Sequence, residues 1–210
     1  MKKSTPLILI AIVTLCILIS CGNNGTTDEP HSGEFSVSDS QKVVFAIENL
    51  KNANSELFSF NHYDSISEGW RLLTGEEWKY IVLKRQNAIN LVLWASVEGK
   101  KGVIFLPDNF NNSFNFSNIS QKSIKPWDDQ IRLIDTNTDP TAQNILTENQ
   151  WTALAQQGAI FLPLNLDNEG GYWQTGDSYL SLSTTFIWPA RGCNTLAMKL
   201  GVRLAMDVKK

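Results

Sequence analysis

A helix start at Thr74 is the feature that most constrains how this chain can fold. Glu77 follows three residues later, which is the spacing of a capping box, where hydroxyl and carboxylate each accept a hydrogen bond from the other residue's amide. Leu73 and Trp78 stand on either side of the cap at the positions of a hydrophobic staple. These four residues predict where a helix begins and which side of it faces the core.

The residues that follow fit the same helix. Trp78, Ile81 and Val82 recur at i, i+3 and i+4, so one side of the helix is apolar. Glutamates occupy its first turn and basic residues its last, as the helix dipole favours. We predict a helix from Gly75 to near Arg85.

The segment Leu146–Gln157 repeats this pattern. Thr147 and Gln150 form a second capping box, and the preceding leucine and Trp151 form a second staple. Gly158 follows as a glycine C-cap. We therefore predict a second short helix that ends at this glycine.

Apolar and β-branched runs predict that the rest of the fold is mostly strands. Alternation over the last run, in particular, predicts one long strand with a single buried face. The predicted strand segments are 35–37, 43–47, 88–96, 103–106, 179–185 and 196–206. The fold class is α+β, with two short helices against mainly antiparallel strands.

Residues 108–144 form a long stretch rich in Asn, Ser, Asp and Thr. Structureless segments of this length are uncommon in compact domains and are usually functional or disordered. The stretch carries three phenylalanines and Trp127. These aromatic residues either attach the loop to the domain or present a binding surface.

The N-terminal residues indicate export and lipid anchoring. Two lysines precede the apolar run Leu7–Ile19, and Leu18–Cys21 fits a lipobox. We expect residues 1–20 to be a signal peptide, Cys21 to be acylated, residues 21–33 to be a flexible tether, and residues 34–210 to form one domain. The expected location is the outer membrane, facing the periplasm or the cell surface.

The composition makes several functions improbable. The formal net charge is −3 and no basic cluster interleaves with aromatic residues, so we expect no nucleic-acid partner. Cys193 is the one thiol left after export and acylation, and His62 is the one imidazole in the predicted domain. No nucleophile-elbow, zinc, P-loop or dinucleotide pattern accompanies them, so we expect no enzymatic activity.

One stretch resembles a known family. Residues 71–80 are similar to the "RLPT..EWEYA" signature of formylglycine-generating-enzyme-like domains, a branch of the C-type lectin fold. With Gly69 and Trp70 in front, the stretch resembles even more closely the "GWRLPT..EW" domains of Bacteroidetes–Fibrobacter surface proteins, the Fibrobacter major paralogous domain type. Leu73 stands where that family usually has proline. Further similar runs, in the family's order, are GVIFLPD at 102–108, GAIFLP at 158–163, GYW at 171–173 and GVRL at 201–204.

The resemblance implies a C-type-lectin-like domain whose long loop region can bind ligands. Formylglycine-generating enzymes hold copper with paired cysteines near the C-terminus, and here that region has only Cys193, so we expect a relative without this activity and no cofactor. Trp127-Asp128-Asp129 resembles the Trp-Asn-Asp motif of calcium-dependent lectins, but the partner motif is absent. Calcium, which takes six to eight oxygens, is therefore the weaker alternative.

We predict a non-catalytic binding or adhesion module anchored to the membrane by lipid, with a glycan or a protein as its ligand. The alternative is a structural or assembly subunit of a surface complex. Aromatic rings with nearby polar groups suit such ligands, although Trp173 could equally be a core anchor. The candidate ligand-binding residues are Trp127, Asp128, Asp129, Trp173 and Trp188.

Overall fold

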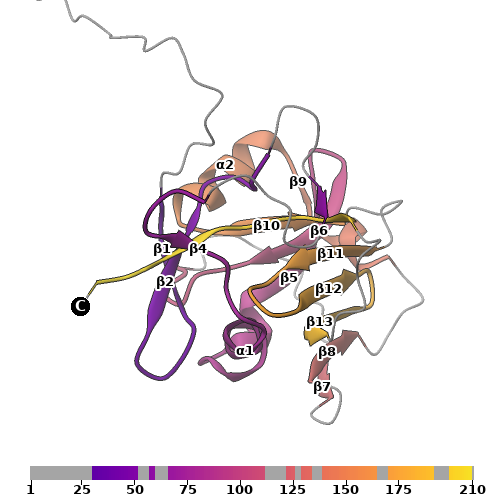
Figure 1. The fold of residues 1–210 in the computed structure, drawn as a ribbon. Coiled ribbons are helices and arrows are strands. Elements are labelled where there is room, and N and C mark those ends of the chain that lie inside the picture. Colours follow the sequence, from indigo (N-terminus) through magenta and orange to yellow (C-terminus); the bar gives the residue numbers. More distant parts are fainter. Residues whose placement is uncertain are drawn as a thin grey trace, which may run out of the picture.

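The fold is mixed α+β, with short helices and sheets that are mostly antiparallel (Figure 1). This computed structural model describes residues 30–51, 57–59, 66–111, 122–125, 129–133, 139–164, 170–191 and 199–209. Cys21, His62, Trp127, Asp128 and Cys193 lie outside these ranges. Within them, no helix is long and apolar enough to cross a membrane.

The first and last strands of the domain lie in the same four-stranded sheet, which we call the terminal sheet. Its strands, in spatial order, are β1 (Pro30–Ser36), β2 (Lys42–Ala46), β15 (Ala205–Asp207) and β4 (Trp70–Arg71). The predicted strands at 35–37 and 43–47 thus form a hairpin. β1 begins at Pro30, which pairs with Ala46, so the last residues of the predicted tether already belong to the fold.

A second four-stranded sheet, the central sheet, contains both Gly-x-Ile-Phe runs. Its spatial order is β10 (Ile160–Pro163), β6 (Lys100–Phe105), β5 (Val92–Val97) and β9 (Ile145–Leu146). β6 and β10 pair antiparallel, with Gly102 opposite Pro163. Glu98 and Gly99 join β5 to β6 with positive φ angles of 50° and 78°, the combination that a tight type I′ hairpin requires. The predicted strand at 88–96 starts instead as a 3₁₀ turn, η2 (Ala88–Leu91).

The third sheet has five strands and corrects the prediction for residues 108–144. Its spatial order is β11 (Gly170–Gln174), β12 (Tyr179–Ser183), β13 (Phe186–Arg191), β8 (Gln130–Leu133) and β7 (Lys122–Lys125). The predicted irregular loop therefore contains a β-hairpin, β7–β8, and also a 3₁₀ turn, η3 (Pro140–Gln143). The polar composition of this stretch did not indicate short strands. β8 pairs with β13, which is distant in sequence, so the local pattern could not reveal the pairing.

The prediction of one continuous strand over 196–206 is also wrong. Its described residues form β14 (Lys199–Leu200), which pairs with β3 (Phe58–Ser59), then a single bridge at Gly201, and then β15. Gly201, Arg203 and Ala205 are buried, as are the residues between them. Both faces of this segment are therefore covered, not one.

Both predicted helices begin where their capping boxes place them. α1 (Gly75–Lys79) has Thr74 as its N-cap, and α2 (Glu148–Gln156) has Thr147, each with both reciprocal hydrogen bonds. The remainder of the first predicted helix is a π-helical turn, η1 (Tyr80–Lys84), in which the Arg85 N–H donates to the Tyr80 carbonyl.

Gly158 ends α2 as predicted. It has a φ of 92°, and its N–H donates to Ala155 while the next N–H, from Ala159, donates to Leu154. This pair of bonds is a Schellman motif, and the left-handed residue in it is most easily a glycine.

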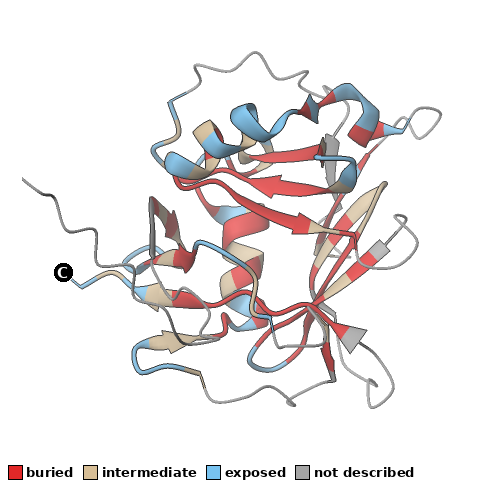
Figure 2. Cartoon of the chain, turned by 90° about the horizontal axis from the view of Figure 1, so that it is seen from above, coloured by how far each residue is buried: buried red, intermediate tan, exposed pale blue. Residues whose placement is uncertain are grey.

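Aromatic rings at the end of α1 join the terminal and central sheets. The rings of Phe35 and Phe45 are 4.9 Å apart, and the Trp78 ring lies 5.6 Å from both Phe45 and Phe105. All four are at most 2 % exposed. Figure 2 shows buried residues where the sheets meet and exposed ones on the outer side of α2.

Arg203 is one of two buried arginines among the described residues. Arg203 donates to the backbone carbonyls of Ala46, Ile47 and Phe161, which joins the terminal sheet to β10. Burial lowers the pKa of Arg203 to about 9, although Glu48 acts in the opposite direction. This gives a structural reason for the arginine in the GVRL run.

Candidate functional site

The outer face of the five-stranded sheet carries a row of side chains from three strands. Tyr172 of β11 is opposite Ser181 of β12, and Ser181 is opposite Trp188 of β13. Successive residues of a strand point to opposite faces, so this row faces away from the core-facing row of Leu182 and Ile187. Tyr172 and Trp188 are half-buried, whereas Ile187 is fully buried.

A second row extends this face. Phe186, half-buried, is opposite Arg132 of β8, which is exposed. The hydroxyl of Ser183 accepts hydrogen bonds from the N–H groups of Thr185 and Phe186, at 3.0 and 3.1 Å, which fixes the tight connection between β12 and β13. Ser181 itself is only 2 % exposed, so we call the surface formed by Tyr172, Phe186, Trp188 and Arg132 the aromatic face.

Neighbouring contacts fix the orientation of two groups on the aromatic face. The Tyr172 ring meets the buried Tyr179 ring edge-to-face, with centroids 5.4 Å apart. The Arg132 Nε donates to the Gln130 side chain at 3.1 Å. Aromatic rings held in this way lose little conformational entropy when a ligand packs on them.

The start of β8 lies at the Trp188 end of the aromatic face. Ile131 pairs with Ile187, so antiparallel pairing brings Trp188 beside Gln130, the first residue of β8. Asp129, a turn residue, directly precedes Gln130, whereas Trp127 and Asp128 lie outside the described residues.

Asp129 fastens this turn to α1. Its carboxylate lies 2.9 Å from the Lys79 ammonium, which also contacts Glu76 at 2.7 Å. The bonds to Glu76 and then to Asp129 raise the pKa of Lys79. Asp129 has a φ of 49°, a left-handed conformation that aspartate tolerates better than most residues. Its observed contact is therefore an ion pair that positions the turn.

Trp173 is on the opposite side of the sheet from Tyr172. It is 2 % exposed, and its ring packs so closely on Gly201 that a Cβ there would overlap it. The structure therefore makes Trp173 a core residue, the alternative that the sequence left open. Tyr172, Trp173 and Trp188 all lie within strands, β11 and β13.

The described residues contain no group of three or more His, Cys, Asp or Glu side chains placed to hold a metal ion. Comparison with family models, curated proteins and solved structures found no match for this chain. The case for a function therefore rests on the geometry of the aromatic face and on the sequence patterns.

Sequence analysis missed Phe186 and Arg132. The alternation of Phe186, Ile187 and Trp188 was a signal for a strand with one outward aromatic side. It could not show that Arg132, more than fifty residues earlier, would lie beside Phe186.

Proposed function

We propose that this chain is an outer-membrane lipoprotein, periplasmic or surface-exposed, whose C-type-lectin-like domain is a non-catalytic glycan-binding or adhesion module. The observation that carries the proposal is the aromatic face and its position. The terminal sheet, where the described chain begins and ends, lies on one side of the molecule, and the five-stranded sheet lies on the other (Figure 1). A domain anchored through its N-terminus would turn the aromatic face away from the membrane.

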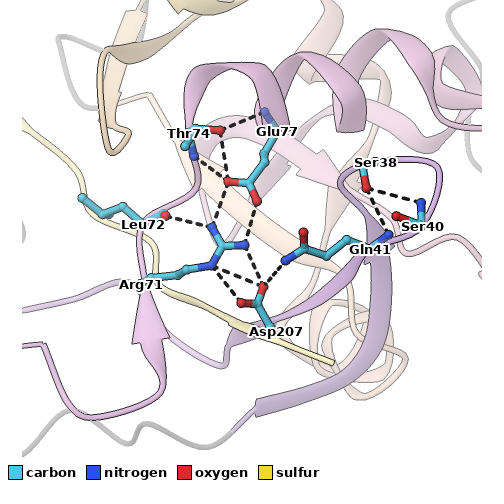
Figure 3. A network of polar contacts seen from close by, with 8 residues as sticks. All are labelled: Ser38, Ser40, Gln41, Arg71, Leu72, Thr74, Glu77 and Asp207. Atoms are coloured by element: carbon cyan, nitrogen blue, oxygen red, sulfur yellow. Dashed lines mark hydrogen bonds and ion pairs between the residues drawn. The ribbon is translucent and has the colours of Figure 1, made fainter. Parts of the chain in front are cut away.

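The finer fold assignment is supported by the local structure of the family-like segments. The helix of the family-like stretch begins at its capping box, with Thr74 as the N-cap. Figure 3 shows Arg71 and Glu77, two residues of the family-like signature, joined by paired hydrogen bonds of 2.8 and 2.6 Å. The signature thus has a structural role at the start of α1, which is consistent with a shared fold and independent of any catalytic activity.

The chemistry of the aromatic face favours a glycan. Tyr172 and Trp188 are two strands apart, a separation of about 10 Å. Sugar rings pack their C–H faces on aromatic rings, while side chains such as tyrosine and arginine can bond the sugar oxygens. Arg132 adds a planar donor that suits an acidic sugar.

The test is a glycan array probed with the full chain in detergent and with single variants of it. We expect Trp188→Ala and Tyr172→Ala each to weaken binding at least tenfold, and Trp127→Ala to weaken it if the turn contributes. Trp151→Ala is the matched control, because Trp151 is also half-buried but lies on α2. Binding that survives both face variants, or that is lost equally in the control, would refute the proposed site.

A second candidate function, assembly into a surface complex, is favoured by one observation. Among the described strands, β7 lies at the edge of the five-stranded sheet, and an open edge can accept a strand from another chain. Its sequence, Lys-Ser-Ile-Lys, has a lysine at each end, which discourages such pairing. Glycan binding is therefore the better supported function.

A further inference from the structure

The outer face of the terminal sheet carries an apolar row. Met206 of β15 is opposite both Val44 of β2 and Trp70 of β4, so these three side chains share one face across three strands. All three are half-buried. We call Val44, Trp70 and Met206 the outer row.

Three acidic groups around the outer row are held in ion pairs. Glu34 pairs with Lys42 at 3.0 Å, Glu48 with Lys51 at 3.2 Å, and Asp207 with Arg71 at 2.7 Å. Arg71 also pairs with Glu77. These pairs reduce the repulsion between the three carboxylates and anionic headgroups.

At the β1–β2 turn there is a hollow of about 270 Å³ whose lining is mostly apolar. Its polar lining residues include serines, Lys209, Asp39 and Lys42, and the Lys42 ammonium is paired with Glu34 at 3.0 Å. It is lined by Ser36, Ser38, Asp39, Ser40, Gln41, Lys42, Val208 and Lys209. A mostly apolar surface edged by serines and lysines suits the boundary between acyl chains and headgroups.

The length of the tether limits how far this face can lie from the bilayer. Pro30, the first residue of β1, is nine residues after Cys21. Nine residues span at most about 30 Å when fully extended, and a flexible tether of this length averages about 15–18 Å. An acylated Cys21 would therefore hold the terminal sheet close to the bilayer at all times.

We propose that the outer row and the adjoining hollow form a membrane-contact face that rests on the bilayer to which Cys21 is anchored. The inference depends on the lipid anchor of the proposed function. A second copy of the chain is a poorer occupant because the outer row is small and a free partner must overcome the full cost of association. The bilayer is already at high effective concentration, so a weak apolar contact is enough to orient the domain.

The test uses the full acylated chain in phosphatidylcholine vesicles that contain a phosphatidylcholine brominated near the headgroup end of its acyl chains. Flotation of the vesicles reports anchoring, and quenching of tryptophan fluorescence by bromine reports contact. We expect clear quenching that falls at least twofold in Trp70→Phe and in Met206→Glu. Trp188→Phe, which removes the tryptophan on the opposite sheet, should keep it.

The outcomes separate the two proposals. Protein that floats but shows no quenching, or the same quenching in Trp70→Phe, would refute the contact face while leaving the anchor intact. Protein that does not float would refute the anchor, and the contact face with it. Quenching that 1 M salt abolishes, or a dimer in detergent that Met206→Glu dissociates, would also overturn the proposal in favour of electrostatic docking or self-association.

Discussion

The carboxylate of Asp177, in the turn between β11 and β12, accepts a 2.8 Å hydrogen bond from the backbone N–H of Gly75, the first residue of α1. A second hydrogen bond of the same length lies beside it: the Gly176 N–H donates to the Leu73 carbonyl at 2.8 Å. A turn one hundred residues away thus completes the capping of the helix that the Thr74–Glu77 box begins. It also joins the five-stranded sheet to α1.

Removing the Asp177 carboxylate should destabilise the protein. An N-terminal helix N–H that loses its acceptor costs about 1 kcal/mol, so Asp177→Ala should lower the free energy of unfolding by about that amount in urea titration. Asp177→Asn, which keeps an acceptor but not the charge, should cost less. Equal losses in both variants would show that the charge, not the hydrogen bond, matters.

The same contact makes a prediction about pH. Burial by itself raises the pKa of Asp177, but hydrogen bonds from Gly75, Thr175 and Ser178 outweigh it and hold the pKa below its ordinary value of 3.8. A lowered pKa in the folded state adds stability above the ordinary pKa, and this stability is lost as the pH falls through the folded value. The difference between wild type and Asp177→Asn should therefore shrink below about pH 4 in thermal unfolding scans.

Arg71 should not be replaceable by lysine. Its guanidinium binds both Glu77 oxygens and also Asp207, which holds a further contact from Gln41 (Figure 3). Lysine keeps the charge but not the planar pair of donors, so Arg71→Lys should cost about 1 kcal/mol of unfolding free energy. Lys84→Ala is the control, since its ion pair with Glu76 is 3.8 Å long and exposed; it should change stability by less than about 0.5 kcal/mol.

Asp108 should be needed for stability, because it is the ion-pair partner of the buried Arg85. The Arg85 side chain is 1 % exposed, donates to Asp108 at 3.1 Å and lies 5.2 Å from the Phe35 ring centre. Burial lowers the pKa of Arg85 to about 10, against the opposing effect of Asp108. Removing one partner of a buried pair typically costs about 3–5 kcal/mol, and Asp108→Ala should approach the lower end because Asp108 is 22 % exposed.

A double-mutant cycle tests this pair by chemical denaturation. Arg85→Met removes the buried charge, so Asp108→Ala in that background should cost at least about 1 kcal/mol less than in the wild type. Additive losses would mean that Asp108 acts mainly through its bonds to the Ser36 amide and hydroxyl.

Two glycines with similar backbones should respond differently to alanine. Gly99 and Gly158 have φ angles of 78° and 92°, so alanine is strained at both, by about 1–2 kcal/mol. A Cβ at Gly99 meets nothing within 4 Å, whereas one at Gly158 would overlap the Gly33 backbone. Gly158→Ala should therefore cost about 1–3 kcal/mol more than Gly99→Ala in the free energy of unfolding, and equal costs would contradict the close packing of these two glycines.

The sequence predicted where both helices begin and where the second one ends. These features depend on interactions between residues at most five positions apart, such as Thr147 with Gln150 or Ala159 with Leu154. Their partners are therefore visible in a single stretch of sequence. The α+β class followed from the same local patterns.

What only the tertiary structure decided is which side chains share a face. Trp173 and Trp188 look alike in sequence, yet the pairing of β11 with β12 and of β12 with β13 puts one in the core and the other on the aromatic face. The pairing of Ile131 with Ile187 likewise joined part of a polar stretch to the five-stranded sheet and brought Arg132 to Phe186. The side-chain period of a strand is two residues, so a shift of one residue in register would reverse these assignments, and register between distant strands is set by the packed core as a whole.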